Sequence, residues 1–500
     1  MASPVISKSR FVSGCQCPKK LYFDIHRREL RPPIDEAQQA LFDAGHEIGG
    51  LAQTRFPGGK DASPENYYDF SASIAQTSDW INEGTKTIYE AAFSADGVLA
   101  ALDILHHEGD ERWAIEVKSS TGVKDYHLTD ASLQYWVMSK AGFAPDRFFL
   151  MHIDNTYVMG ERLDTHQFFK LADITDEIIA KQSWVNDKLN ELKAVIASPN
   201  EPVLEIGKHC SSPFACDYMH HCWKHIPENS VFSLSYARGK DWELYENGIL
   251  ELSSIPDEFQ LNHRQKMQVD GVKKGTEYID VDSIKTFLSD WQYPLYLFDF
   301  ETIFPAIPVL NGTRPFQQVP FQYSLHIVSN SKGDFTHREF LANPEDFNLR
   351  GTNDPRLQLI NQLKTDIGPV GHIVSYNATF EIGVLKSLAV DFPEEAEYLN
   401  SLVARFVDLL VVFRNAWYYK PAMGGSASIK SVLPAIAPEF SYEDLVIGNG
   451  GDASNTFLTM IKKVFTGDAA LTQTHLLKYC ERDTFGMVIL YHELMKVINS

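Results

Sequence analysis

The sequence lacks long hydrophobic runs, an excess of basic residues and a large number of cysteines. No apolar run approaches the roughly 20 residues that a membrane-spanning helix needs. The N-terminus also lacks the apolar segment of a signal peptide, so we expect a cytoplasmic protein. Only six cysteines occur in 500 residues. In a reducing compartment we expect them to be free thiols or metal ligands rather than disulfides.

The net charge of −21 argues against a bulk electrostatic attraction to nucleic acid, although it leaves room for a local one. The N-terminal segment does carry a basic group, consisting of Lys8, Arg10, Lys19, Lys20, Arg27, Arg28 and Arg31. A solvated helix face would explain these residues equally well. A hydrophobic content of 44% and a charged content of 22% indicate a globular chain, and its length predicts two or three domains.

Acidic residues stand on two neighbouring apolar runs in the first half. The run from Gly97 to Leu105 carries Asp103, and the run from Arg112 to Val117 carries Glu116 and leads into Lys118. Residues 108–111 have the composition of a hairpin turn. Alternate residues of a strand share a face, so Asp103, Glu116 and Lys118 can meet at one place. Paired carboxylates can bind a divalent cation, so one interpretation of this segment is a metal site. The simpler interpretation is a surface hairpin with a salt bridge.

A helix is predicted to follow from Asp125, with Gln134 on it. This order of Asp, Glu-x-Lys and helical Gln resembles the RecB-like branch of the PD-(D/E)XK nucleases. The resemblance implies a restriction-endonuclease-like α/β domain over residues 1–225. It implies that Asp103, Glu116 and the Val117 carbonyl bind a metal ion. In the same family pattern, Lys118 assists the reaction and Gln134 supports the site. His46 and Glu90 are weaker candidates for the same site.

Three cysteines recur at regular spacing, as Cys210, Cys216 and Cys222, and suggest a metal centre. Cys17, which precedes a proline, or Cys15 could supply a fourth ligand. This pattern resembles the iron–sulfur RecB-like nucleases, including the CRISPR-adaptation exonucleases. The resemblance implies that Cys17, Cys210, Cys216 and Cys222 hold a 4Fe–4S cluster that staples the two ends of the domain. The spacing is wider than is usual in that group, so zinc remains an alternative, with these possible ligands: His209, His220, His221 and His225.

In the second half, a buried strand is predicted from Tyr293, and it carries Asp299 and Glu301 on one face. Two carboxylates rarely occupy a strand interior unless a cation neutralises them. Farther on, Asn377 and Glu381 are four residues apart, which would place them on one face of a helix. Tyr479 and Asp483 have the same spacing on the helix predicted from Leu476 to Leu494.

Together these motifs resemble the DnaQ-like 3′–5′ exonucleases of the DEDDy type. The resemblance implies a ribonuclease H-like domain over residues 293–500, in which Asp299, Glu301 and Asp483 surround two Mg²⁺ or Mn²⁺ ions and Tyr479 orients the attacking water. The family has an aspartate where this sequence has Glu381. Asp408 is the alternative fourth acid.

Residues 226–292 are predicted to form a helical bridge, and the fused arrangement resembles an uncharacterised bacterial family. The sequence therefore predicts a metal-dependent nuclease with two active sites, an exonuclease for which DNA is favoured over RNA. The alternative is a nucleic-acid-binding scaffold or an iron–sulfur sensor in which one or both sites are inactive.

Overall fold

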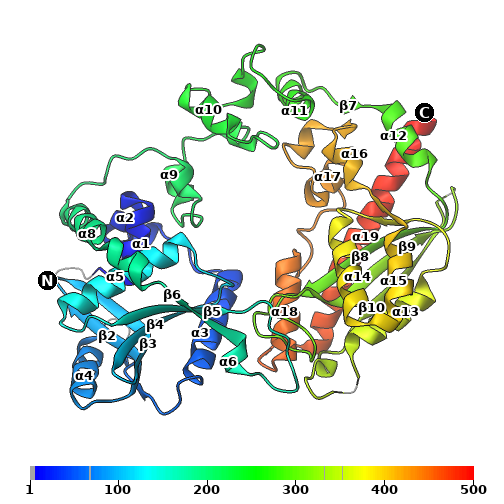
Figure 1. Ribbon diagram of the computed structural model, residues 1–500. Helices are drawn as coiled ribbons and strands as arrows, with labels where there is room; N and C mark the ends of the chain where they lie inside the picture. The colour runs from blue at the N-terminus through cyan, green and yellow to red at the C-terminus, as the bar shows by residue number, and fades with distance from the viewer. Residues whose placement is uncertain (1–5, 67–68, 332, 352) are drawn as a thin grey trace. The chain divides into compact units, whose positions relative to one another are not determined.

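The computed structural model describes residues 6–66, 69–331, 333–351 and 353–500. Contacts divide the chain into two compact units, Met1–His225 and Ile226–Ser500, and each is described by itself (Figure 1). Each unit combines helices with a sheet, which confirms the mixed α/β class. In the described part of the chain, no helix has the length and apolar character required to cross a membrane.

The first unit contains a six-stranded sheet in the order β1-β2-β3-β4-β5-β6. Its strands are β1 (Lys60–Asp61), β2 (Thr87–Ala95), β3 (Val98–Glu108), β4 (Glu111–Lys118), β5 (Arg147–Ile153) and β6 (Phe169–Asp173). Strands β2, β3 and β4 form an antiparallel meander, β5 runs parallel to β4, and β6 is antiparallel to β5. The predicted hairpin at 108–111 is confirmed. After Ile153 the chain adds a further strand, β6, which forms the sheet edge.

Helices cover this sheet and its ends. They are α1 (Lys8–Gln16), α2 (Pro18–His26), α3 (Glu36–Gln53), α4 (Ser71–Asn82), α5 (Asp125–Lys140), α6 (Thr165–Phe168), α7 (Thr175–Ala180), α8 (Gln182–Ala197) and α9 (Met219–Cys222). Strand β3 buries Val98, Ala100 and Leu102 at alternate positions, and these side chains join α5 and α8 in one core. The same alternation turns Asp103 to the other face.

The second unit contains a five-stranded sheet in the order β10-β9-β8-β11-β12. These strands are β8 (Leu295–Ile303), β9 (Val319–Val328), β10 (Phe335–Leu341), β11 (Ile373–Ser375) and β12 (Phe406–Asp408). The first three pair antiparallel, whereas β11 is parallel to both β8 and β12. The strands predicted from sequence at Phe321–Val328 and His337–Leu341 are confirmed with slightly wider bounds.

Helices pack on both faces of this sheet (Figure 1). The helices of the whole second unit are α10 (Lys240–Glu246), α11 (His263–Lys274), α12 (Val281–Ser289), α13 (Pro355–Asp366), α14 (Thr379–Asp391), α15 (Ala396–Val403), α16 (Leu410–Arg414), α17 (Ile429–Ile436), α18 (Gly450–Ile461) and α19 (Ala469–Asn499), of which α10 and α11 pack in a separate small core. Along β8, Tyr296 and Phe298 face the core formed with α13–α15, whereas Leu295 and Leu297 face the core formed with α12 and α19. The period of two therefore directs Asp299 and Glu301 toward α19.

Residues 226–292 belong to the second unit. They hold α10, α11 and α12 together with a small apolar core that includes Val231, Leu244 and Val269. Strand β7 (Tyr278–Ile279) pairs antiparallel with β13 (Tyr418–Tyr419). The segment therefore contributes a strand as well as helices.

Candidate active sites and cysteine centre

The first acidic cluster lies where β3 and β4 run side by side. The Val117 backbone N–H donates a hydrogen bond of 2.5 Å to Asp103 Oδ2. Lys118 Nζ donates to Glu116 Oε1 at 2.7 Å, as expected for residues that share one face of a strand. Glu116 is almost wholly buried, at 2% exposure. The structure thus brings Asp103 and the Glu116–Lys118 motif together.

Two further charged residues enter this cluster. Lys8, on α1, donates from Nζ to both carboxylate oxygens of Glu116, at 3.0 and 3.1 Å. Asp130, on α5, accepts from Lys118 Nζ at 2.7 Å. Sequence reasoning missed both roles. Asp130 lies four residues before Gln134, a spacing that could have identified it, whereas no sequence signal ties Lys8 to a residue 108 positions away.

Gln134 lies beneath the cluster and is completely buried. Its Nε2 donates to Asp130 Oδ1 at 3.4 Å, and its Oε1 is buried with no hydrogen-bond partner in the described part of the chain. A buried amide oxygen without a partner is costly unless water or an ion satisfies it. His46 is exposed on α3, and no described contact ties it to this cluster.

Burial and charge shift the titration of these groups in opposite directions. Burial raises the pKa of Asp103 to about 8, and the neighbouring Glu116 carboxylate adds to this shift. Burial also opposes ionisation of Glu116, but the Lys118 and Lys8 ammoniums hold its pKa below the usual range. The cluster therefore combines one stable carboxylate with a second carboxyl that needs a further cation to ionise.

Glu90 is a further acid of this cluster, besides Asp103, Glu116 and Asp130. It lies on β2 in a left-handed conformation with φ of 52°, which is costly for a residue other than glycine. Burial raises its pKa to about 7, and the charge of Glu116 raises it further. Such strain is often kept where a side chain must point toward a functional site, so Glu90 is a stronger candidate than its sequence context indicated.

The second acidic cluster gathers four carboxyls from three elements. Asp299 and Glu301 come from β8, Glu381 from the first turn of α14, and Asp483 from α19. Burial and the charge of Asp483 raise the pKa of Asp299 well above its usual value. The same two causes raise the pKa of Glu301 to about 8. These effects require the carboxyls of β8 and α19 to lie near one another.

Glu381 rather than Asp408 points into this cluster. The Glu381 and Asp299 carboxyls interact through a hydrogen bond, and Glu381 Oε2 is buried without a partner among the described residues. Asp408 Oδ1 instead accepts from the backbone N–H groups of Asn377 at 2.9 Å and Leu410 at 3.1 Å. The expectation that Asn377 shares a helix face with Glu381 is wrong, because Asn377 lies before α14 with φ of 75°.

Tyrosines and one lysine border the second cluster. Tyr442 Oη donates to Asp483 Oδ1 at 2.5 Å. Burial raises the pKa of Asp483 to about 6, against the hydrogen bonds from Tyr442 and Tyr479 that lower it. Lys430 Nζ lies 5.4 Å from the centre of the Tyr479 ring and 5.3 Å from that of Tyr442. The Lys430 ammonium lowers the pKa values of Glu301 and Asp483, and sequence reasoning had not identified Tyr442.

The start of α18 lies beside the second cluster. A Cβ added at Gly450 would meet Glu301 Oε2 at 3.5 Å and Tyr479 Oη at 3.9 Å, which are ordinary van der Waals contacts. The Cys480 thiol lies 3.7 Å from Asp299 Oδ2, and Asp299, Glu301 and Cys480 each offer a ligand atom within 4.8 Å of the others. Cys480 was expected to be a plain buried thiol, but it borders this cluster.

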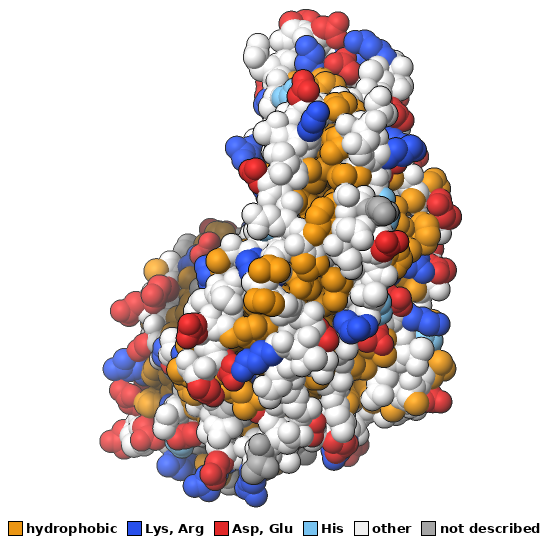
Figure 2. Space-filling view, turned by 90° about the vertical axis from the view of Figure 1, so that its right-hand side faces the viewer, with side chains coloured by type: hydrophobic (Ala, Val, Ile, Leu, Met, Phe, Trp, Pro, Cys, Tyr) orange, Lys and Arg blue, Asp and Glu red, His pale blue; other side chains and the backbone are white. Residues whose placement is uncertain are grey.

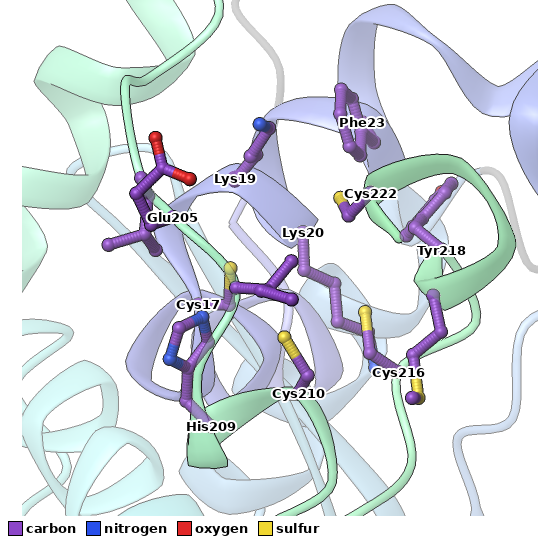
Figure 3. A pocket seen from close by; sticks show the side chains of 13 residues that line it. Cys17, Lys19, Lys20, Phe23, Glu205, His209, Cys210, Cys216, Tyr218 and Cys222 are labelled. Atoms are coloured by element: carbon purple, nitrogen blue, oxygen red, sulfur yellow. The ribbon is translucent and has the colours of Figure 1, made fainter. Parts of the chain in front are cut away.

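The remaining cysteines define a hollow of about 360 Å³ between α2 and residues 204–222. Cys17, Cys210, Cys216 and Cys222 line it, and Figure 3 shows their sulfur atoms turned toward a common space. Cys17 immediately precedes α2, where Pro18 opens the helix. Cys15 does not line this hollow, and its charged neighbours are Lys188 and Glu191 of α8.

Burial raises the pKa of the Cys216 thiol to about 11 and also raises those of Cys17 and Cys222. These thiols carry their protons at neutral pH until a metal displaces them. Among the described residues, no three of the four sulfur atoms lie within 4.8 Å of one another. His209 lines the hollow, whereas His221 packs edge-on against Phe23.

Comparisons with known proteins find a family model that is similar to part of the second unit. Residues 296–428 match the family described as "Domain of unknown function (DUF2779)". That range holds Asp299, Glu301 and Glu381 and ends before α17, so Tyr479 and Asp483 lie outside it.

Similar proteins come from Mycoplasma and Ureaplasma. The chain is 28% identical over 213 residues to "Uncharacterized protein MG366 homolog" of Mycoplasma pneumoniae, covering 39% of this chain and 31% of that protein. It is 25% identical over 286 residues to "Uncharacterized protein UU173" of Ureaplasma parvum, covering 47% and 39% respectively. The matches thus span roughly a third of the length of these curated relatives.

Proposed function

We propose that the chain is a metal-dependent nuclease that hydrolyses phosphodiester bonds, with an exonuclease site in the second unit. The observation that carries this proposal is the convergence of Asp299, Glu301, Glu381 and Asp483, buried together and faced by Lys430. Buried carboxyls with raised pKa values are unstable as anions until cations neutralise them. Carboxylate oxygens are ligands that Mg²⁺ and Mn²⁺ prefer.

The topology of each unit supports this proposal. The order β10-β9-β8-β11-β12, with the first three strands antiparallel, is consistent with a ribonuclease H-like domain of the DEDDy type. The meander β2-β3-β4, followed by α5 and the parallel strand β5, is consistent with a PD-(D/E)XK domain of the RecB-like type. In both units two of the acids stand on central strands, Asp103 and Glu116 on β3 and β4 and Asp299 and Glu301 on β8.

The residues present suit the chemistry of a phosphodiester. Bound divalent ions would offset the charge of the diester and of the attacking and leaving oxygens. Burial, with the charges of Asp483 and Glu301, raises the pKa of Tyr479, so its hydroxyl keeps its proton and can hold a water or a phosphate oxygen. In the first unit, the Lys118 ammonium lies beside Glu116 and can offset charge on a phosphate.

Contact with nucleic acid in this proposal is local. Figure 2 shows lysine and arginine side chains scattered among acidic ones over the face that it presents, in keeping with the net charge of −21. Sites that hold divalent cations can attract phosphate where the bulk charge does not. We propose DNA ahead of RNA as the substrate, and the assay below includes both.

We further propose that Cys17, Cys210, Cys216 and Cys222 hold a 4Fe–4S cluster. Tetrahedral zinc at about 2.3 Å from each thiolate would need sulfur atoms about 3.8 Å apart. The wider spacing of these thiols favours a polynuclear cluster over one zinc ion. Bound there, the cluster would cross-link α2 to residues 210–222. Brown colour and visible absorbance lost on Cys216→Ser would support it, whereas stoichiometric zinc without iron would contradict it.

The test is an assay of the full chain on end-labelled single- and double-stranded DNA and RNA, with Mg²⁺, with Mn²⁺ and with EDTA. We expect cleavage with either metal and none with EDTA. Asp299→Ala and Lys118→Ala, singly and together, assign activity to the two sites, with the exposed Glu394→Ala as the control. Absence of cleavage under every metal, or undiminished cleavage by the double variant, would contradict the proposal.

One observation favours a second candidate function for the first unit. Lys8 binds both oxygens of Glu116 and so takes the position of a cation. In this candidate the first unit binds nucleic acid without cutting it, and the second unit alone is active. The candidate requires that Lys118→Ala leaves cleavage unchanged while Asp299→Ala abolishes it.

A further inference from the structure

A further group of side chains that can bind a metal lies on the flank of α19 that faces β9 and β10 (Figure 1). His326 on β9 and His337 on β10 are direct cross-strand partners, and Glu481 comes from α19. One ring nitrogen of each histidine and a carboxylate oxygen of Glu481 lie within 4.8 Å of one another. Three donors from three elements therefore converge at one point.

This group is separate from the acidic cluster. Glu481 and Asp483 are two residues apart on α19, which turns their side chains about 200° from each other around the helix axis. Asp483 faces the carboxyls of β8, so Glu481 points away from them. The three residues play no part in the nuclease proposal.

Hydroxyl groups orient both imidazole rings. His326 Nδ1 is 2.9 Å from Thr484 Oγ1, and His337 Nε2 is 2.9 Å from Ser324 Oγ. The two hydroxyls are themselves hydrogen-bonded at 2.7 Å. Each ring thus uses one nitrogen for a hydroxyl contact and has a second nitrogen, His326 Nε2 or His337 Nδ1, to offer to a ligand. Metal-binding histidines are commonly fixed by such a second hydrogen bond.

The surroundings suit a metal bound by neutral imidazole. The His326 ring lies 5.5 Å from that of Phe335 and 5.6 Å from that of Phe485, which limits access of water on that side. The His326 side chain is itself buried, at 2% exposure. Glu481 is exposed and leaves the opposite side open to solvent.

We propose that His326, His337 and Glu481 bind a divalent transition-metal ion of the zinc class. Two imidazoles and one carboxylate are a donor set that Zn²⁺ takes, with water in the fourth position. Bound there, the ion ties α19 to the antiparallel half of the sheet. Because α19 also carries Tyr479 and Asp483, the ion fixes the helix that positions them.

The test counts zinc on the full chain. The protein is stripped with chelator, equilibrated with Zn²⁺ in the presence of excess Mg²⁺, freed of unbound ion and analysed for metal. We expect His337→Gln and Glu481→Gln each to hold about one zinc ion fewer per chain than the unaltered protein. The matched controls are His475→Gln, on the same helix, and the exposed Glu394→Gln. Both controls should hold as many zinc ions per chain as the unaltered protein.

A thermal melt of the same proteins supplies an independent readout. Zn²⁺ should raise the Tm of the unaltered protein and of both controls more than that of His337→Gln or Glu481→Gln. Equal zinc content in the unaltered protein and in Glu481→Gln would overturn the proposal. That variant decides the outcome even if His337→Gln misfolds, because Glu481 is exposed. The result does not depend on nuclease activity.

Discussion

Glu381 and Asp408 are both candidates for the fourth acid of the second cluster, and their hydrogen bonds distinguish them. Asp408 is occupied by the backbone N–H groups of Asn377 and Leu410, whereas Glu381 interacts with Asp299. The extra methylene of glutamate is accommodated because Glu381 stands in the first turn of α14. The assignment of Glu381 as the fourth acid follows from these contacts.

The first prediction concerns this assignment. Glu381→Gln should lower metal-dependent cleavage by at least about 100-fold, because it removes a charge from the metal site. Even mutation of residues that only hydrogen-bond to metal ligands typically lowers metal affinity or activity about 10- to 100-fold. Asp408→Asn retains an oxygen for the two N–H groups and should have a much smaller effect. Initial rates at saturating Mg²⁺ test this, with Glu394→Gln as the control. A larger loss for Asp408→Asn would reverse the assignment.

The second prediction concerns Cys480. Its thiol lies 3.7 Å from Asp299 Oδ2 and adds a soft donor to a site made of oxygen ligands. Thiolate ligands select soft metals, so Cd²⁺ should raise the Tm of the unaltered protein more than that of Cys480→Ser. Mg²⁺ should not distinguish the two. Cys15→Ser, in the first unit, is the control, and an equal response to Cd²⁺ in Cys480→Ser would contradict the role.

At the scale of elements, α1 and the central strands of the first unit are joined by one buried ion pair. Lys8 reaches Glu116 from α1, and Lys118 reaches it along β4. The first cluster therefore depends on the docking of α1. An N-terminal helix that seemed a basic surface feature in the sequence is part of the site.

The third prediction follows from this contact. Lys8→Met should lower the free energy of unfolding by about 1 to 3 kcal/mol, because a buried carboxylate loses one charged donor and keeps the other. Lys86→Met, which removes an exposed lysine, should change it little. Urea unfolding measures both. The ion pair would have no net stabilising role if the two variants were equally stable.

At the scale of the whole molecule, the two acidic clusters hold more carboxyls with a raised pKa than with a lowered one, since only the pKa of Glu116 is lowered among the acids discussed. Asp103, Glu301 and Glu381 each have a pKa of about 8, mainly because of burial. In the unfolded chain these groups ionise near pH 4 to 4.5. Between these values the folded protein binds more protons than the unfolded one, so stability falls as pH rises.

The fourth prediction is therefore a pH-dependent effect of metal. In EDTA, Tm should fall as pH rises from about 5 to about 8, and Mg²⁺ should reduce this fall because it favours the ionised carboxylates. Glu116, whose pKa is lowered in the folded protein, does not oppose this trend. Its contribution to stability is already complete above the pKa that it has in the unfolded chain, so it does not change between about pH 5 and about pH 8. Melts at several pH values test this, and Glu301→Gln should flatten the EDTA profile. A Tm gain from Mg²⁺ that is independent of pH would contradict it.

The sequence by itself determined the local elements and the kinds of donor they carry. Short apolar runs located β3, β4, β8 and β9, and four-residue spacing located Tyr479 and Asp483 on one helix, because these patterns depend on neighbours along the chain. It did not determine β6 or the turn at Asn377, where short segments carry little periodic signal.

Only the tertiary structure decided which side chains converge. Lys8 on Glu116, Cys480 beside Asp299, and His326 with His337 and Glu481 join residues from separate elements. Such meetings depend on how helices dock onto a sheet and on the register of its strands, which the local pattern does not encode. The choice of Glu381 over Asp408 has the same origin, since it depends on which backbone groups each carboxyl reaches.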